Sequence, residues 1–187
     1  MLDLNINSKW TLFLDRDGVI NRRLLGAYVS SREEFTFEPH CLDALKLLAS
    51  LFSRILVVTN QQGIGKDLMS ETQLEAVHQY FLERVAETEG RIDGIYYCPE
   101  LAAAKSSCRK PNSGMALQAQ IDFPEIDFSR SIMVGDSISD MEFGQNLGMK
   151  TVFIEGKTEE EDRAKGLEVD ARFSSLWDFA CQLKKES

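Results

Sequence analysis

The sequence predicts an α/β fold of the Rossmann-like, three-layer type, in which helices cover both faces of a mainly parallel sheet. Two observations support this prediction. Short apolar segments alternate along the chain with longer segments in which apolar residues recur at helical spacing. The composition, with 43% hydrophobic and 27% charged residues among 187, is that of a folded globular protein. We therefore expect a single domain over residues 1–187.

The elements begin with a strand, a helix and a second strand. Trp10–Leu14 is an apolar segment that predicts a buried strand ending at Asp15. After Pro39, the apolar residues of Leu42–Phe52 keep to one helical face and predict the first helix. Arg54–Thr59 is apolar and β-branched, which is typical of a strand covered on both faces. This order favours a right-handed crossover between parallel strands.

The same alternation continues to the end of the chain. Ser70 and Gln73 form the pattern of a capping box, which predicts the start of the second helix. Strands and helices then alternate over these segments: Gly94–Cys98, Met115–Ile121, Ser131–Val134, Ser139–Leu147 (stopped by Gly148), Thr151–Ile154 and Leu176–Lys185 (capped by Ser175). Asn21–Phe37 and Pro99–Asn112 lack this periodicity, and loops of such length are often functional. The acidic run Glu159–Asp162 is expected to be a solvated loop or a helix start.

The charge of the chain excludes some classes of partner. The formal net charge is −9, whereas binding to nucleic acids or anionic membranes requires a basic surface. No apolar run reaches the roughly 20 residues that span a bilayer, and the first residues do not form a signal peptide. We expect a cytoplasmic monomer without nucleic-acid or membrane partners. Its cysteines are expected to be reduced thiols: Cys41, Cys98, Cys108 and Cys181.

Polar residues that suit phosphoryl transfer follow the predicted strands. Ligands of an open parallel sheet bind at the carboxyl ends of its strands. The residues near these ends are Asp15, Asp17, Thr59, Asn60, Arg109, Lys110, Asp136 and Asp140. Each pair alone is ordinary turn or surface chemistry. Their combination in this order favours a site that binds and transfers a phosphoryl group.

The carboxylates predict a nucleophile and a metal site. Asp15 and Asp17 are two residues apart in extended chain, so their side chains point to the same side. Asp136 would join them from another strand, and three close carboxylates require a neutralising cation. Magnesium binds such oxygen ligands, which allows Asp15 to stay ionised and attack phosphorus. Asp17 would act as the general acid and base.

Other residues are predicted to hold the negative charge of the phosphate. Thr59 offers a hydroxyl group, Asn60 an amide and Lys110 an ammonium group. Arg109 would form two hydrogen bonds to a second anionic group of the substrate. The partner predicted from these residues is a small phosphorylated metabolite.

Four segments resemble the motifs of the haloacid dehalogenase superfamily of phosphohydrolases. They are Phe13–Asn21 (FLDRDGVIN), Val57–Gly63 (VVTNQQG), Cys108–Pro111 (CRKP) and Val134–Met141 (VGDSISDM). The resemblance covers about Lys9–Gly156. The chain is most similar to the branch that contains heptose bisphosphate phosphatases and histidinol phosphatases. Asp93–Pro99 and Cys108–Met115 favour the heptose enzymes.

The resemblance implies roles for the carboxylates. Asp15 would be the nucleophile and Asp17 the acid and base. Magnesium would be bound by Asp15, by Asp136 and by the backbone carbonyl of Asp17, with Asp140 bound to it or next to its ligands.

The resemblance also implies how substrate is held. Thr59 and Lys110 would stabilise the phosphoryl group, and Arg109 would help to recognise the substrate. Members of this branch have no large cap domain. The segment Arg23–Tyr28 would therefore close over the substrate.

The chain departs from the branch at a structural zinc site. The usual form, C-x-H followed by C-x-C, here reads Cys98-Pro99-Glu100 and Ser106-Ser107-Cys108. Two thiolates and a carboxylate make a poor tetrahedral site, so we expect no zinc at Cys98 and Cys108. The loop would instead be held by packing and hydrogen bonds.

The function expected from these observations is magnesium-dependent hydrolysis of a phosphate ester through an aspartyl-phosphate. The first choice of substrate is D-glycero-D-manno-heptose 1,7-bisphosphate, with loss of the 7-phosphate. Histidinol phosphate, another sugar phosphate and a nucleotide remain alternatives, as does a non-catalytic phosphate-binding domain. His40 and His78 are interpreted as surface or packing residues.

Overall fold

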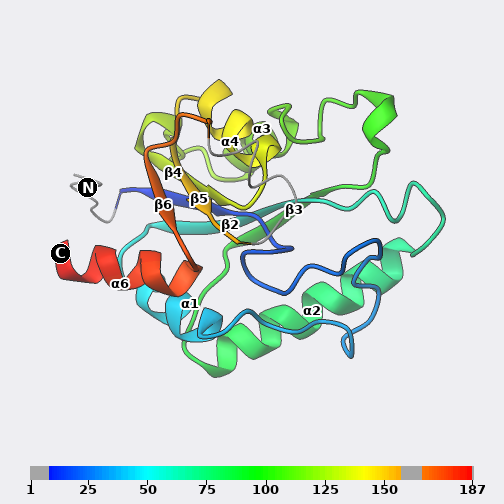
Figure 1. Cartoon of the computed structure of the whole chain (residues 1–187), viewed down its shortest axis with the longest axis horizontal. Helices are drawn as coiled ribbons and strands as arrows, with labels where there is room; N and C mark the ends of the chain where they lie inside the picture. Colours follow the sequence, from blue (N-terminus) through cyan, green and yellow to red (C-terminus); the bar gives the residue numbers. More distant parts are fainter. Residues whose placement is uncertain (1–8, 157–165, 187) are drawn as a thin grey trace.

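A six-stranded sheet forms the centre of the computed structural model, which describes residues 9–156 and 166–186. The strand order is β3-β2-β1-β4-β5-β6, and all neighbouring strands are parallel (Figure 1). The strands are β1 (Thr11–Leu14), β2 (Arg54–Asn60), β3 (Gly94–Cys98), β4 (Ser131–Gly135), β5 (Lys150–Ile154) and β6 (Ala171–Phe173). The predicted fold class is confirmed, whereas the extent of the single domain stays a prediction.

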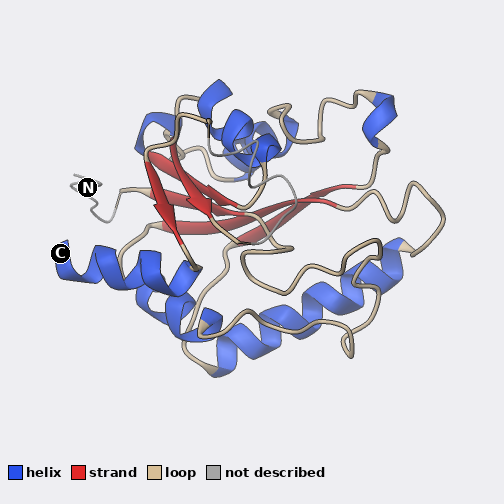
Figure 2. Ribbon diagram, in the orientation of Figure 1, coloured by secondary structure: helices blue, strands red, loops and turns tan. Residues whose placement is uncertain are grey.

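Helices cover both faces of this sheet (Figure 2). They are α1 (Cys41–Ala49), α2 (Glu71–Glu87), α3 (Gly114–Asp122), α4 (Ile138–Asn146) and α6 (Leu176–Glu186), with short 3-10 helices at Ala102–Ala104 and Phe128–Arg130. α1, α2 and α6 lie on one face of the sheet, and α3 and α4 lie on the other. None of the helices described is long and apolar enough to cross a membrane.

The central strands send alternate side chains into two apolar cores. In β1, Leu12 and Leu14 belong to the core beneath α1, α2 and α6, whereas Phe13 belongs to the core beneath α3 and α4. Ile55 and Leu56 of β2 divide in the same way. Each fully buried side chain of this size stabilises the fold by about 1.5–3 kcal/mol. This double burial holds the carboxyl ends of the strands in fixed positions.

Local signals in the sequence fix several helix ends. Ser70 Oγ accepts a hydrogen bond from the Gln73 amide at 3.2 Å, and Gln73 Oε1 accepts one from the Ser70 amide at 2.8 Å. Gly148 ends α4 with a φ of 72°, a conformation that glycine adopts without strain. Ser175 Oγ accepts from the Asp178 amide at 3.1 Å. These predicted caps are confirmed.

β6 was not expected from the sequence. It has three residues, all only half-buried, at the edge of the sheet. Such a segment is too short to show periodicity, and its position depends on backbone pairing with β5. The predicted run Glu159–Asp162 and most of the polar start of the chain lie outside the described residues.

The two aperiodic stretches contain no strand or α-helix, as predicted, and the second includes the short 3-10 helix Ala102–Ala104. The loop Asn21–Phe37 is pinned by an isolated backbone bridge between its first and last residues. Phe35 is buried, and its ring stacks on that of Phe81 from α2 at 5.7 Å. The loop therefore packs on the main body through its own apolar residues.

One prediction about the cysteines is wrong. Cys98 and Cys108 form a disulfide, whereas Cys41 and Cys181 are free thiols. The end of β3 and the loop before Arg109 place the two Cα atoms 5.5 Å apart, a separation that suits a disulfide. Ser106 Oγ lies 3.2 Å from Cys108 Sγ. The absence of zinc at this position stays a prediction.

Candidate active site

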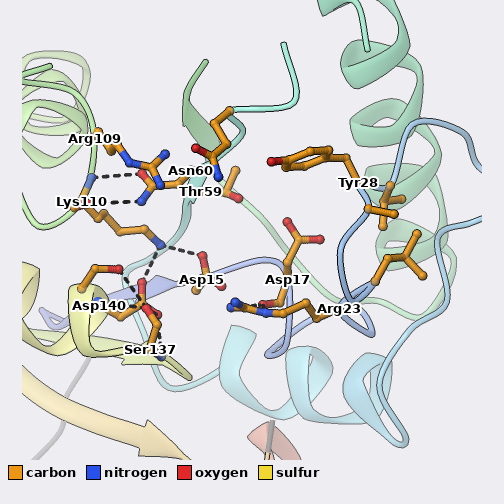
Figure 3. Close-up of a pocket in the computed structure, with 15 residues that line it drawn as sticks. Asp15, Asp17, Arg23, Tyr28, Thr59, Asn60, Arg109, Lys110, Ser137 and Asp140 are labelled. Atoms are coloured by element: carbon orange, nitrogen blue, oxygen red, sulfur yellow. Dashed lines mark hydrogen bonds and ion pairs between the residues drawn. The ribbon is translucent and has the colours of Figure 1, made fainter. Parts of the chain in front are cut away.

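The carboxyl ends of β1, β2 and β4 and the loops after them enclose a cavity of about 260 Å³ (Figure 3). Its lining includes most of the residues expected from the sequence: Asp15, Asp17, Thr59, Asn60, Arg109, Lys110 and Asp140. Asp136 is fully buried, and oxygens of Asp15, Asp136 and Asp140 lie within 4.8 Å of one another. Residues from four separate segments thus meet at one end of the sheet.

Lys110 supplies a buried positive charge to this cluster. Its Nζ lies 2.6 Å from Asp15 Oδ1 and 2.6 Å from Asp140 Oδ1. It also donates a hydrogen bond to the backbone carbonyl of Val58 at 2.6 Å. The three N–H groups of the ammonium therefore have three partners. Because its side chain is only 2% exposed, Lys110 is held in this position.

Burial and the repulsion between neighbouring carboxylates raise the pKa values of Asp15 and Asp136. Burial raises the pKa of Asp15 to about 6, although the Lys110 charge opposes the shift. Burial and the neighbouring Asp15 raise the pKa of Asp136 well above its usual range. A further cation would relieve this repulsion. The donors available are carboxylate oxygens and the Asp17 carbonyl, a set that fits magnesium.

Asp17 lies in a different environment from Asp15. Arg16 Nη2 donates to both of its carboxylate oxygens at 3.0 and 2.9 Å. Asn21 Nδ2 donates at 2.9 Å and Gln61 Nε2 at 2.8 Å. Burial disfavours the charged form, but the Arg16 charge and these hydrogen bonds outweigh burial and lower the pKa of Asp17. Asp17 is therefore held as a carboxylate.

Arg16 and Gln61 are site residues that sequence reasoning missed. Arg16 is fully buried, and its Nη1 lies 3.1 Å from His78 Nε2 on α2. Gln61 also donates to Thr59 Oγ1 at 2.8 Å. Both lie inside motifs that were recognised, Asp15-Arg16-Asp17 and Thr59-Asn60-Gln61. Their positions next to the candidate residues were the one signal for a role in the site. Because arginine side chains are mostly exposed, burial of Arg16 was not expected.

Arg23 extends from the loop after β1 into the carboxylate cluster. Its Nη2 lies 2.6 Å from Asp136 Oδ1 and donates to the Asp17 carbonyl at 3.0 Å. Nε donates to the same carbonyl at 3.3 Å. The sequence placed Arg23 in the segment that covers the substrate. Its ion pair with Asp136, a residue 113 positions away, was not predicted.

Asn60 and Arg109 occupy less direct positions than the sequence suggested. The Asn60 side chain accepts a hydrogen bond from the Lys110 amide at 3.0 Å and donates to the Lys110 carbonyl at 3.2 Å. It therefore fixes the loop that carries Lys110. Arg109 lies at the outer part of the site, where its Nη1 donates to the Glu100 carbonyl at 3.4 Å.

Two glycines allow the backbone to approach the carboxylates. A Cβ at Gly18, which has a φ of +107°, would lie 1.9 Å from Asp136 Oδ2. A Cβ at Gly135 would lie 2.2 Å from the Cβ of Asp140. Ser137 and Asp140 form a capping box at the start of α4, so the Asp140 carboxylate also caps this helix.

Comparison with known proteins identifies the family. A family model described as HAD-hydrolase-like matches residues 107–179. A Mycobacterium bovis protein named D-glycero-alpha-D-manno-heptose-1,7-bisphosphate 7-phosphatase is 39% identical over 177 residues, which cover 92% of this chain and 90% of that protein. The chain belongs to the haloacid dehalogenase superfamily of phosphohydrolases.

Other members agree in sequence and in structure. An Escherichia coli protein named D-glycero-beta-D-manno-heptose-1,7-bisphosphate 7-phosphatase is 36% identical over 186 residues, 94% of each chain. The crystal structure of a D,D-heptose 1,7-bisphosphate phosphatase from B. bronchiseptica, complexed with magnesium and phosphate, superposes with a TM-score of 0.86. That alignment has 28% identity and covers 95% of this chain and 99% of that one. The B. bronchiseptica protein and this chain therefore share one fold over nearly the whole length of each.

Proposed function

We propose that this phosphatase removes the 7-phosphate from D-glycero-D-manno-heptose 1,7-bisphosphate in a magnesium-dependent reaction. The observation that carries the proposal is Asp15, which lies at the end of the central strand with Lys110 and two further buried carboxylates around it. The names of the relatives from Mycobacterium bovis and Escherichia coli support the choice of substrate.

Asp15 acts as the nucleophile in the first step. Its carboxylate oxygen forms a bond to phosphorus while the bond from phosphorus to the sugar oxygen breaks. The leaving oxygen takes a proton from Asp17. The product is an aspartyl-phosphate at Asp15 and a sugar with a free hydroxyl group.

Asp17 acts as the base in the second step. It takes a proton from water, whose oxygen attacks phosphorus, and the bond from phosphorus to Asp15 breaks. The hydrogen bonds that lower the pKa of Asp17 suit this step. In the first step, the nearby negative charge of the substrate phosphate raises the pKa of Asp17 and allows it to carry the proton.

Magnesium would be held by Asp15, Asp136 and the Asp17 carbonyl, with Asp140 beside them. When bound, it neutralises charge on the carboxylates and on the phosphoryl oxygens. Lys110 stabilises the same oxygens, and Thr59 offers its hydroxyl group to them. Asn60 contributes by holding the backbone of Lys110.

Arg109 is placed to recognise the second phosphate of the substrate. It lines the outer part of the cavity, on the loop that also carries Lys110. A guanidinium group binds phosphate oxygens through two parallel hydrogen bonds. The relatives named above differ in the anomer that they act on, so both anomers are included in the test.

The test is a steady-state assay with magnesium on both anomers of the bisphosphate, on heptose 7-phosphate and on histidinol phosphate. We expect the highest kcat/KM for one bisphosphate anomer, with release of its 7-phosphate identified by NMR. Asp15→Asn is the control and is expected to lose activity on the order of a thousandfold or more. Full activity in Asp15→Asn would refute the mechanism, and a preference for histidinol phosphate would refute the substrate.

A further inference from the structure

Among the described residues, Lys110 and Arg23 form ion pairs with the cluster of Asp15, Asp136 and Asp140, and these two cations are held very differently. Lys110 is 2% exposed and has partners for each of its N–H groups. Arg23 has a side chain that is 35% exposed and comes from a loop on the cavity wall. Leu25, two residues further on, is 77% exposed, whereas Leu24 is partly buried against the core. Arg23 is therefore the more exposed of the two cations.

The position of Arg23 overlaps with that of the proposed metal. Its guanidinium group contacts Asp136 Oδ1 and the carbonyl oxygen of Asp17. These two groups are also proposed ligands of magnesium. A guanidinium group that donates to the Asp17 carbonyl oxygen at 3.0 Å and contacts Asp136 Oδ1 at 2.6 Å places its positive charge beside the oxygens that would bind magnesium, so the two cations compete for them.

We propose that Arg23 is a built-in substitute for the metal: it neutralises Asp136 in the metal-free enzyme and must leave for magnesium to bind. The inference rests on the proposed magnesium site. Each magnesium ion that binds breaks the ion pair between Arg23 and Asp136, so this ion pair weakens the apparent affinity for the metal. Arg23 is then a positioning residue for Asp136 and sets the magnesium concentration at which the enzyme is loaded.

The experiment is calorimetric titration of MgCl2 into EDTA-treated and dialysed protein. Arg23→Gln removes the competing charge, and Arg22→Gln is the matched control because it removes the same charge from the exposed neighbouring residue. We expect Arg23→Gln to bind magnesium about tenfold more tightly than the parent, and Arg22→Gln to stay within about twofold. Arg23→Lys keeps the positive charge but lacks the planar guanidinium group that reaches both oxygens. Its affinity for magnesium should lie between those of the parent and Arg23→Gln.

Thermal unfolding in EDTA supplies a second measurement. Arg23→Gln should unfold at a lower temperature than Arg22→Gln without metal, and saturating magnesium should close this gap. An affinity in Arg23→Gln that equals or falls below that of Arg22→Gln overturns the inference, as does Arg23→Lys binding more tightly than Arg23→Gln. Loss of magnesium binding in every protein, the parent included, overturns the proposed metal site itself.

Discussion

Asp15 and Asp17 are two residues apart, yet their carboxyl groups have opposite tendencies to ionise. Burial raises the pKa of Asp15 to about 6, and Lys110 only partly offsets this effect. Arg16, Asn21 and Gln61 outweigh burial at Asp17 and lower its pKa. A pair of carboxyl groups in such different surroundings is a common basis for separate nucleophilic and acid–base roles.

Gln61 is predicted to affect kcat because it donates a hydrogen bond to Asp17. Gln61→Leu removes a donor to Asp17 Oδ2 at 2.8 Å and leaves Thr59 Oγ1 without that donor. We expect kcat to fall by about tenfold, because general acid–base catalysis depends on the position and pKa of the acid. The loss of a hydrogen bond to the charged form should also raise the pKa of Asp17. The measurement is kcat as a function of pH, and an unchanged profile would contradict the role of Gln61.

His78 is predicted to make stability depend on pH. Burial and the Arg16 charge lower its pKa to about 3 in the folded protein, from an ordinary value of 6.5. Between these values the unfolded chain binds a proton that the folded protein does not, so stability falls as pH falls. The loss is about 1.4 kcal/mol per pH unit. Urea unfolding from pH 6.5 to 5 should show a flatter dependence for His78→Gln than for the parent.

A control separates this effect from the simple loss of a histidine. His40→Gln removes the other histidine, which lies exposed at the start of α1. Parallel curves for the parent and His78→Gln would show that His78 does not cause the dependence.

At the scale of elements, the junction between β4 and α4 joins the fold to the site. Gly135 ends β4, and Ser137 and Asp140 cap α4 within five residues of it. The backbone at Gly135 lies directly against the Asp140 side chain. The same carboxylate accepts a hydrogen bond from Ser137 Oγ at 2.7 Å and pairs with Lys110. Strand, helix and site therefore share one close contact.

Gly135→Ala is predicted to disturb that contact. The added Cβ would lie 2.2 Å from the Cβ of Asp140, so α4 or the strand end must shift. We expect a loss of about 1–3 kcal/mol in the free energy of unfolding, together with weaker magnesium binding. Gly166→Ala is the control because, within the part of the chain that the structure describes, no atom is found within 4 Å of its added Cβ. Equal stabilities of the two variants in urea unfolding would refute the prediction.

The disulfide between β3 and the following loop gives another prediction at this scale. It joins residues ten positions apart. Closing a loop of this length stabilises the folded state by about 3 kcal/mol in the chain-entropy description. Cys108→Ser should therefore be less stable than the parent in oxidising buffer, and urea unfolding with a reductant should remove most of the difference. One bound zinc per chain in the purified protein would contradict the disulfide.

The strands and helices were predictable where a local signal exists. The capping box at Ser70, the glycine at Gly148 and the apolar run of Arg54–Thr59 all lie within the segment that they describe. β6 depends on pairing with β5, which no local pattern encodes. The disulfide likewise depends on how the chain brings Cys98 near Cys108.

The same distinction applies to the site. Asp15, Asp136 and Lys110 follow strands or a recognisable motif, and the order of the strands brings them together. The contacts of Arg16 with His78 and of Arg23 with Asp136 join residues that are 62 and 113 positions apart. Such partners become visible only when side-chain positions are known.

At the scale of the whole molecule, magnesium is predicted to stabilise the fold. A ligand that binds only the folded state at 100 times its Kd adds about 2.7 kcal/mol to the free energy of unfolding. For a protein of this size, Tm should rise by about 5–10 °C. The measurement is calorimetric unfolding with EDTA and with MgCl2, at equal ionic strength. Asp136→Asn should lose most of this rise, and an equal rise in that variant would contradict the proposed ligand set.

The strand order also has a consequence for the synthesis of the protein. β1 leaves the ribosome before the other strands, yet it lies inside the sheet, where Leu14 pairs with Val57 on one side and with Val134 on the other. The second partner appears only when most of the chain has been made, and Asp136 and Asp140 follow it. A growing chain therefore carries Asp15, the proposed nucleophile, for a long time before Asp136 and Asp140, the proposed metal-site residues, are made. Chains interrupted before β4 should have neither a complete sheet nor a phosphatase site.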